Sequence, residues 1–418
     1  MTYKAYNIKS IKKLPQIIKN LPKEEIENIE IAAKIFPFKV SNYVLDLIDW
    51  KNYKDDPIFR LVFPQKEMLK EEDFKRLKNA PPDEVDKIIY EIRMKLNPHP
   101  AGQKENIPEI NGIKLAGSQH KYKETILFFP RQGQTCHAYC SFCFRWPQFT
   151  GINELKFAMK EIEALIEYIK AHPTITDILF TGGDPMVMSA KIFKTYIDAI
   201  IDAKIPHLQN IRIGSKALAF WPYRFISDSD SQELLDTFKK IVDSGYHLAF
   251  MAHFSHYKEL ETDAVKEAIK NIQKTGAIIR TQSPILNHIN ASSEVWEKMW
   301  KEQVRLGMVP YYMFMPRDTG AKEYFDVPLA KAYKIYKDAI SKVSGLARTV
   351  RGPSMSAAPG KIAVTGVSEI NGKKVFVLNM LQAKNPSLVN IPFFAKYDEK
   401  ASWIDELKPA FANKFIFE

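Results

Sequence analysis

Three cysteines lie close together in the chain and could share one metal-binding task. The sequence has 418 residues and 3 cysteines, Cys136, Cys140 and Cys143, in a CxxxCxxC pattern with Phe142 before the last one. Three thiolates can bind three corners of a cubane [4Fe-4S] cluster and leave the fourth iron without a protein ligand. That iron is then open to a substrate or a cofactor.

Other interpretations of the cysteines compete with this one. A structural zinc site closes with four ligands, and His137, the obvious fourth, directly follows Cys136, which claims the same point in space. A disulfide framework requires an even number of cysteines and a secreted protein. Burial as small unreactive hydrophobic residues is the remaining alternative. The spacing favours the cluster and resembles the signature loop of the radical S-adenosylmethionine (SAM) enzymes, in which SAM binds the open iron.

The composition predicts a soluble cytoplasmic protein. Hydrophobic residues make up 45% and charged residues 26%, which are ordinary globular values. The first ten residues carry charges where a signal peptide needs an apolar core, and no apolar stretch reaches the ~18 residues of a spanning helix. The net charge is +11, but the basic residues are spread along the chain and accompanied by acidic ones, as in Lys23-Glu-Glu-Ile-Glu. This pattern favours a solvated basic surface over a nucleic-acid site.

From Thr125 onward, short apolar runs alternate with helical patterns, which is typical of repeated βα units. Six strands are expected, beginning at Thr125, Asp177, Ile211, His247, Ala277 and Val309. Helices are expected between them at Glu154 to Ala171, Ala190 to Ala203, Ser231 to Ser244, Thr262 to Thr275 and Ser292 to Leu306. The pattern predicts an α/β fold, a partial (β/α)6 TIM-like barrel over residues 111–345, with its chemistry at the C-terminal ends of the strands.

Two flanking parts are expected outside this barrel. Residues 1–110 form a helical N-terminal region, with amphipathic helices at 69–76 and 83–96. Residues 346–418 form a C-terminal segment that contains Lys361 and a closing extension, in which residues 365–418 close the structure or make an interface by packing alone.

Polar residues follow several of the expected strands. Gly182 and Gly183 would let the backbone approach a ligand, and Asp184 could accept a hydrogen bond from an ammonium group, although Gly-Gly-Asp is also a common tight turn. Equivalent rim positions, where satisfied polar residues are also common, are occupied by Ser215, His253 and Gln282.

One lysine follows a turn after the barrel. Pro359 and Gly360 would present Lys361 on the next extended segment. A lysine amine in an apolar pocket can react with the aldehyde of pyridoxal phosphate (PLP), whereas a solvated surface lysine is the alternative.

From about His120 to Val364 the chain resembles the lysine 2,3-aminomutase family, including the aminomutase that modifies elongation factor P. The matching segments are His120-Lys-Tyr, the cysteine loop, Thr181-Gly-Gly-Asp, Ile211-Arg-Ile-Gly-Ser, Ala252-His-Phe-Ser-His, Thr281-Gln-Ser, Pro310-Tyr-Tyr and Pro359-Gly-Lys-Ile. The resemblance implies a [4Fe-4S] cluster, SAM and PLP, with PLP carried by Lys361. It further implies that Tyr122 lies against the PLP ring, Lys121 lies near its phosphate, and the rim residues Gly182, Gly183, Asp184, Ser215, His253 and Gln282 contact cofactor. Arg145 matches the arginine that binds the substrate carboxylate.

The chain departs from that family at three places. Arg317 and Ser354 stand where the lysine enzyme has two aspartates for the substrate ammonium, although a shift of one residue would place Asp318 at the first position. A cation facing an ammonium group is repulsive, so a substrate with an acidic or neutral side chain, bound by Arg317, is expected. Thr125 replaces a phosphate-binding arginine, and the tail lacks the family's zinc cysteines.

The predicted function is therefore a radical SAM, PLP-dependent amino-acid 2,3-aminomutase, which moves an α-amino group from C2 to C3. It would act on a small-molecule amino-acid substrate, receive electrons from a donor such as flavodoxin or ferredoxin, and is compatible with a homo-oligomer. Two alternatives stay open. One is a radical SAM enzyme of the same fold that works without PLP, and the other is a non-catalytic iron-sulfur protein that binds nucleic acid.

Overall fold

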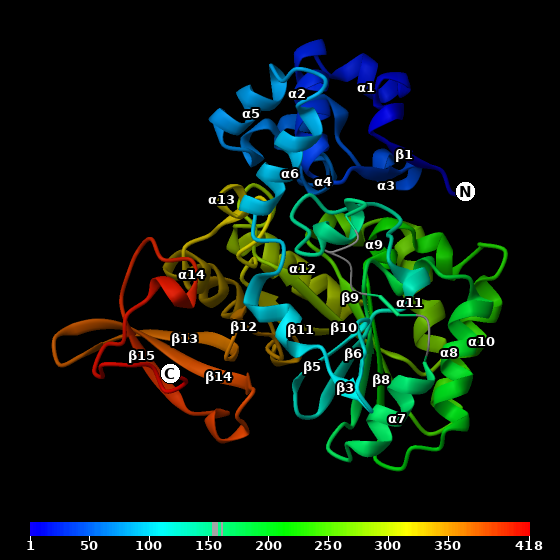
Figure 1. Cartoon of the computed structure of the whole chain (residues 1–418), viewed down its shortest axis with the longest axis vertical. Coiled ribbons are helices and arrows are strands. Elements are labelled where there is room, and N and C mark those ends of the chain that lie inside the picture. The colour runs from blue at the N-terminus through cyan, green and yellow to red at the C-terminus, as the bar shows by residue number, and fades with distance from the viewer. Residues whose placement is uncertain (153–157, 160–161) are drawn as a thin grey trace.

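The computed structural model describes residues 1–152, 158–159 and 162–418. A sheet curled into a partial barrel lies at the centre, N-terminal helices lie against one end of it, and C-terminal strands extend from one side (Figure 1). The α/β class and the partial (β/α)6 barrel expected from the sequence are confirmed.

Within the described residues, eleven strands form one sheet in the order β15-β14-β13-β12-β11-β10-β9-β8-β7-β6-β5. Neighbouring strands from β6 to β12 run parallel, whereas β5 and the strands after β12 pair antiparallel. The parallel strands are β6 (Thr125–Phe128), β7 (Asp177–Phe180), β8 (Asn210–Ser215), β9 (His247–His253), β10 (Ile278–Pro284), β11 (Val309–Phe314) and β12 (Arg351–Ser356). The first six are the strands predicted from the apolar runs.

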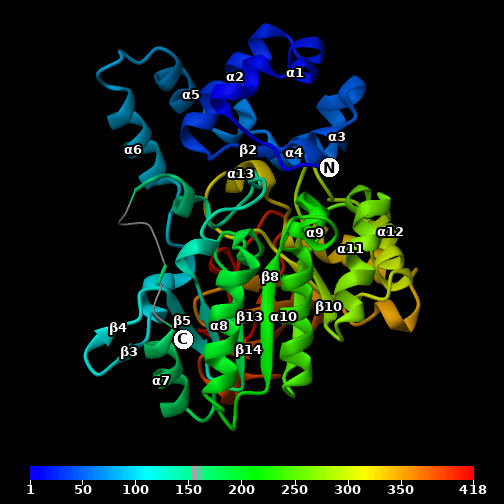
Figure 2. The same ribbon diagram turned by 90° about the vertical axis from the view of Figure 1, so that its right-hand side faces the viewer.

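A helix follows each of the first six parallel strands. These helices are α7 (Glu163–Ala171), α8 (Ala190–Asp202), α10 (Ser231–Asp243), α11 (Asp263–Lys274), α12 (Ser293–Arg305) and α14 (Leu329–Ile340). Figure 2 shows α8 and α10 side by side over the strands. The helix expected to begin at Glu154 is described only from Glu163, and the earlier part of that prediction lies outside the described residues.

The apolar periodicity and the capping residues explain why these segments are helical. In α11, Val265, Ala268, Ile269 and Ile272 repeat at helical spacing and are buried against the sheet. The hydroxyl of Thr262 accepts a hydrogen bond from the backbone N–H of Val265 and so caps the first turn. Each such helix covers its strand pair and fixes the strand ends where the polar residues lie.

The N-terminal part is mainly helical, as expected. Its elements are β1 (Ala5–Asn7), α1 (Pro15–Asn20), α2 (Lys23–Ile35), β2 (Lys39–Ser41), α3 (Asn42–Asp46), α4 (Pro57–Val62), α5 (Glu71–Lys78) and α6 (Val85–Lys95). Two short strands, β3 (Glu109–Ile110) and β4 (Ile113–Lys114), lead to β5 (Ser118–Tyr122). Helices α5 and α6 agree with the predicted amphipathic helices. The proposed divisions at residues 110 and 345 stay a prediction.

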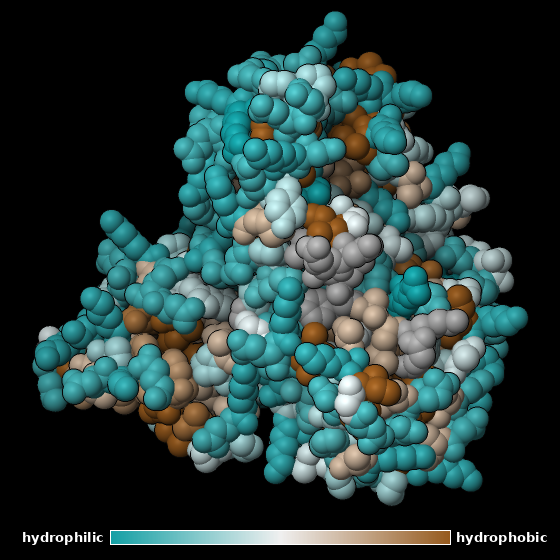
Figure 3. Space-filling view, viewed as in Figure 1, coloured by the Kyte–Doolittle hydropathy of each residue, from teal (hydrophilic) through white to brown (hydrophobic). Residues whose placement is uncertain are grey.

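The C-terminal part continues the sheet with β13 (Gly360–Ile370), β14 (Lys373–Ala383) and β15 (Pro392–Lys396). Figure 3 shows a mostly hydrophilic face of the molecule, with apolar side chains gathered over these strands. The exposed apolar residues of this part include Val389, Ile391 and Phe411. Among the helices of the described residues, none has the length and apolar character needed to cross a membrane.

Candidate functional site

The three cysteines form one compact loop that follows β6. All three are free and half-buried, and the backbone N–H of Cys143 donates to the carbonyl of Cys140 at 3.1 Å. Burial raises the pKa of the Cys136 thiol, and the charges of Asp184, Cys143 and Cys140 raise it further. Burial also raises the pKa of Cys143 to about 11. All three thiols belong to this one short loop.

As a set of metal ligands, the three thiols fit a cubane cluster. Among the described residues, no group of three or more His, Cys, Asp or Glu side chains converges to hold one metal ion. A mononuclear site needs such convergence, whereas each thiolate of a [4Fe-4S] cluster binds a different iron. Three thiols on one short loop, with no fourth cysteine in the chain, fit a cluster that keeps one iron open.

The N-terminal residues hold this loop in place. The backbone N–H of Tyr139 donates to the carbonyl of Lys39 at 2.8 Å, and the ammonium group of Lys39 donates to the carbonyl of Cys136 at 2.7 Å. The backbone N–H of Ser141 donates to the carbonyl of Leu61, also at 2.8 Å. Strand β2 and the end of α4 therefore hold the backbone of the cysteine loop in position by hydrogen bonds. Nothing in the local sequence around Lys39 or Leu61 indicates this contact.

The two glycines after β7 allow the start of the cysteine loop to approach closely. A Cβ on Gly183 would lie 2.4 Å from the carbonyl oxygen of Thr135 and 2.6 Å from its nitrogen. A Cβ on Gly182, whose φ is +144°, would lie 2.2 Å from the side-chain nitrogen of Gln134. Gly183 leaves no room for a side chain beside the backbone of Thr135, and the φ of Gly182 is one that other residues rarely adopt, so both positions favour glycine where β7 meets the cysteine loop.

Asp184 joins the ends of β7 and β8. Its buried carboxylate accepts hydrogen bonds from the Ser215 hydroxyl at 2.8 and 3.0 Å and from the backbone N–H groups of Met186 and Lys216, each at 2.9 Å. Burial raises the pKa of Asp184 to about 6. The structure thus brings Asp184 and Ser215 together, and their direct partners are each other and the backbone.

His253 and Gln282 belong to one row of residues that crosses four strands. Gln282 on β10 is paired in register with His253 on β9 and with Tyr312 on β11, and Tyr312 is paired with Arg351 on β12. The ring of His253 lies 5.7 Å from that of Phe142 in the cysteine loop. This row therefore runs from the cysteine loop towards Lys361.

Lys361 lies in an aromatic cage near the other end of this row. Its amine nitrogen lies 4.2 Å from the centre of the Tyr312 ring, 5.8 Å from that of Tyr122 and 5.6 Å from that of Phe314. The amine donates to the side-chain oxygen of Gln382 at 3.0 Å. Burial lowers the pKa of Lys361 well below its usual value, which favours the neutral, nucleophilic amine.

Cations surround this amine. Besides burial, the charges that lower the pKa of Lys361 are those of Arg212, Arg351, Arg317 and Lys121. Burial lowers the pKa of Lys121 to about 7, and its amine lies 5.6 Å from the centre of the Tyr122 ring. A neutral amine between aromatic faces in a positive field fits an anionic aromatic aldehyde, and PLP has this chemistry.

Arg212 occupies the area where the sequence lacks an arginine at Thr125. Its guanidinium donates to Asp177 at 2.8 Å and to the hydroxyl of Thr125 at 3.4 Å. Sequence reasoning missed Arg212 and Arg351. A charged residue between Ile211 and Ile213 in a buried strand was the available signal for Arg212.

Arg145 and Arg317 each pack a guanidinium group on a phenylalanine ring. The guanidinium of Arg145 is buried and lies 4.2 Å from the centre of the Phe129 ring, and that of Arg317 lies 4.3 Å from the centre of the Phe144 ring. Burial lowers the pKa of Arg145 to about 9, and the charge of Arg317 acts in the same direction. The two cations are therefore neighbours.

Asp318, the alternative to Arg317 at the first aspartate position, and Ser354, at the second, have other surroundings. Asp318 is exposed and lies 3.6 Å from the ammonium group of Lys322, and its carbonyl accepts from the side chain of Asn97 at 2.6 Å. Ser354 is fully buried, and its hydroxyl donates to the carbonyl of Met313 at 3.4 Å. Arg317, not Asp318, therefore belongs to the cluster around Lys361.

A three-cysteine loop after the first strand of a curled parallel sheet defines the class of radical SAM enzymes. No protein-family model matches the chain. A protein of Aquifex aeolicus named "Putative L-lysine 2,3-aminomutase" is 31% identical over 391 residues, which cover 94% of this chain and 93% of that protein. The L-lysine 2,3-aminomutase of Acetoanaerobium sticklandii is 26% identical, over 81% of this chain and 71% of that protein.

The chain thus belongs to the lysine 2,3-aminomutase family of radical SAM enzymes. The expected cofactors, a [4Fe-4S] cluster, SAM and PLP, are those of this family. Among solved structures, Streptococcus suis SuiB bound to the precursor peptide SuiA aligns with 62% of this chain and 50% of that chain, at 13% identity and a TM-score of 0.36. That likeness is too distant to add to the assignment.

Proposed function

We propose that the protein is a PLP-dependent aminomutase that moves the α-amino group of an amino acid from C2 to C3. The observation that carries the proposal is the Lys361 amine, which is caged by aromatic rings and surrounded by cations at the end of a row that leads to the cysteine loop. Such an amine is suited to hold PLP close to a radical source.

Each part of the site has a proposed task. Cys136, Cys140 and Cys143 would hold the cluster, and the rim around Gly182, Gly183, Asp184, Ser215, His253 and Gln282 would hold SAM. When bound, the cluster and SAM supply one-electron chemistry, and PLP carries the migrating amino group. Lys361 would carry PLP, Tyr122 would lie against its ring, and Lys121 would lie near its phosphate.

Arg145 is proposed to bind the α-carboxylate of the substrate. Its planar guanidinium suits a carboxylate, and it lies two residues after the last cysteine, on the loop that would hold the cluster. This arrangement would orient the substrate between the radical source and Lys361.

Aromatic side chains would exclude water from this region. Phe142 lies 6.0 Å from Phe325 between ring centres, and Tyr312 stacks on Phe314 at 4.7 Å. A radical reaction needs such exclusion, because a stray hydrogen donor quenches it. An electron donor such as flavodoxin or ferredoxin and a homo-oligomeric state stay part of the proposal.

The test is anaerobic reconstitution with iron, sulfide, SAM and PLP, followed by incubation with amino acids under reducing conditions and analysis for β-amino isomers. We expect a PLP absorbance band that Lys361→Ala abolishes, and at least one β-isomer. Cleavage of SAM in a protein that never binds PLP would favour the radical SAM alternative without PLP. Salt-dependent RNA or DNA binding with no SAM cleavage would favour the non-catalytic alternative.

A further inference from the structure

We propose that the substrate is a dicarboxylic α-amino acid whose side-chain carboxylate is bound by Arg317. This inference rests on the aminomutase proposal and adds the substrate class. It is argued from the charges that surround Lys361 and from the environment of Arg317.

Within the described residues, Arg317 has no anionic partner. Among the described residues, no hydrogen bond or ion pair joins its guanidinium to another group, and its contact is with the face of Phe144. Burial is the main cause that lowers the pKa of Lys121 and that of Arg145, and the positive charge of Arg317 lowers both pKa values further. A guanidinium has five N–H donors and stays charged, so in this half-buried place it needs an acceptor.

The nearby carboxylates do not fill this role. Asp318 and Asp405 line the same opening of about 50 Å³ as Arg317, together with Ser356 and Trp403. Within the described part of the chain, however, neither carboxylate lies within ion-pair distance of Arg317. Asp318 lies near Lys322 instead, and Asp405 is exposed.

The balance of charge around Lys361 leaves one cation for the substrate side chain. Arg212 is paired with Asp177, whereas Lys121, Arg317 and Arg351 have no carboxylate within ion-pair distance in the described residues. The α-carboxylate is already assigned to Arg145, and a phosphate with a charge of about −1.5 to −2 compensates roughly two of these three cations. A second substrate carboxylate matches the remaining one, whereas an ammonium group would add to the repulsion.

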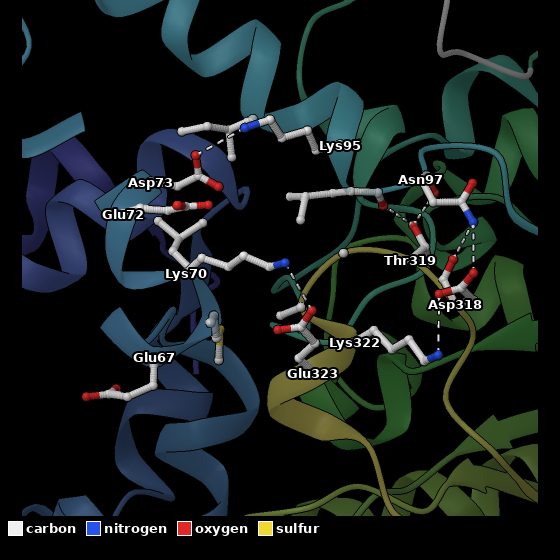
Figure 4. Close-up of a pocket in the computed structure, with 16 residues that line it drawn as sticks. Glu67, Lys70, Glu72, Asp73, Lys95, Asn97, Asp318, Thr319, Lys322 and Glu323 are labelled. Atoms are coloured by element: carbon white, nitrogen blue, oxygen red, sulfur yellow. Dashed lines mark hydrogen bonds and ion pairs between the residues drawn. The ribbon is translucent and has the colours of Figure 1, made fainter. Parts of the chain in front are cut away.

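The loop that carries Arg317 is fixed. The Thr319 hydroxyl accepts from the indole N–H of Trp146 at 3.0 Å and donates to the carbonyl of Asn97 at 2.6 Å. Figure 4 shows the side chain of Asn97 joined to Asp318, the Thr319 hydroxyl joined to the backbone of Asn97, and Asp318 joined to Lys322. A fixed loop holds the guanidinium in place before the ligand binds, which reduces the entropic cost of binding.

The experiment measures ligand binding by the holoenzyme loaded with cluster, SAM and PLP, without a reductant, so that no turnover occurs. L-glutamate, L-aspartate, L-lysine and L-norleucine are titrated, and the change in PLP absorbance gives each dissociation constant. We expect glutamate or aspartate to bind at least about tenfold more tightly than norleucine and lysine. Arg317→Met should weaken dicarboxylate binding by about 10- to 100-fold, leave norleucine binding within about twofold, and be partly rescued in Arg317→Lys.

Arg305→Met is the matched control, because Arg305 is exposed on α12 and pairs with Glu302. Lysine binding as tight as glutamate binding would overturn the inference, as would an Arg317→Met variant with unchanged glutamate affinity. If Arg317→Met does not fold, the ranking of ligands by the unmodified enzyme decides. If PLP never binds, the proposed function itself fails, whereas neutral amino acids that bind as well as dicarboxylates contradict only the substrate class.

Discussion

The amine nitrogen of Lys361, on β13, lies 4.2 Å from the centre of the ring of Tyr312, which belongs to β11. Strand β12 separates the two, so the amine reaches across it into the barrel. The aromatic face desolvates the amine, and the surrounding arginines disfavour its protonation. Both effects keep the amine neutral.

The first prediction concerns the pH dependence of PLP attachment. Because the pKa of Lys361 is lowered, its neutral form persists below the pH at which ordinary lysines are almost fully protonated. Labelling of the apo protein with PLP and a reductant should therefore change less than about threefold from pH 7 to 9 at Lys361. Exposed lysines should gain about tenfold per pH unit. Peptide mass spectrometry measures both, and a parallel rise at Lys361 would contradict the lowered pKa.

The second prediction concerns Gly183. In Gly183→Ala the new methyl group would overlap the backbone of Thr135, so β7 and the cysteine loop must separate. We expect a loss of roughly 1–3 kcal/mol in unfolding free energy and less iron per chain after reconstitution. Gly345→Ala is the control, because no atom lies within 4 Å of its added Cβ. Equal iron content in the two variants would show that the close approach is dispensable.

The third prediction concerns the N-terminal support of the loop. Lys39→Met removes the hydrogen bond to the Cys136 carbonyl at 2.7 Å but keeps most of the aliphatic chain. The unfolding free energy should fall by about 1 kcal/mol, and the cluster should be lost faster to a chelator. Lys51→Met, at an exposed position, should match the unmodified protein. Chelator kinetics followed at the cluster absorbance distinguish the two, and identical rates would remove the assigned role of Lys39.

The fourth prediction concerns Thr319, a positioning residue. Thr319→Val keeps the shape of the side chain but loses the bonds to Trp146 and Asn97, which should lower stability by about 1–2 kcal/mol. Because the Arg317 loop then loses a fixed point, KM should rise more than kcat falls. Thr319→Ser, which restores the hydroxyl, should recover most of the KM. A fall in kcat alone would indicate a different role.

The sequence was informative where local pattern decides the structure. The six apolar runs and their intervening helices have strong periodicity, and the Pro359-Gly360 turn placed Lys361 at the start of an extended segment. Strand β12 was missed because Arg351-Gly-Pro-Ser has few apolar residues, and its parallel pairing with Tyr312 and Phe314 comes from tertiary contact.

Contacts between distant segments could not be predicted in the same way. The bonds from Lys39 to the cysteine loop and the contact of Arg351 with the Tyr312 ring at 4.4 Å depend on how the chain packs. Asp184 illustrates the limit at the site itself. Its position after a strand indicated a polar role, but only the structure shows that Ser215 and the backbone already occupy its carboxylate.

The cysteine loop takes its shape from partners on both sides of it in the chain. Lys39 and Leu61 precede it, and the backbone N–H of Asp184, which donates to the carbonyl of Thr135 at 2.7 Å, follows it. A nascent chain therefore cannot complete the loop until Asp184 has left the ribosome. A chain that ends before Asp184 would keep only the N-terminal supports of the loop.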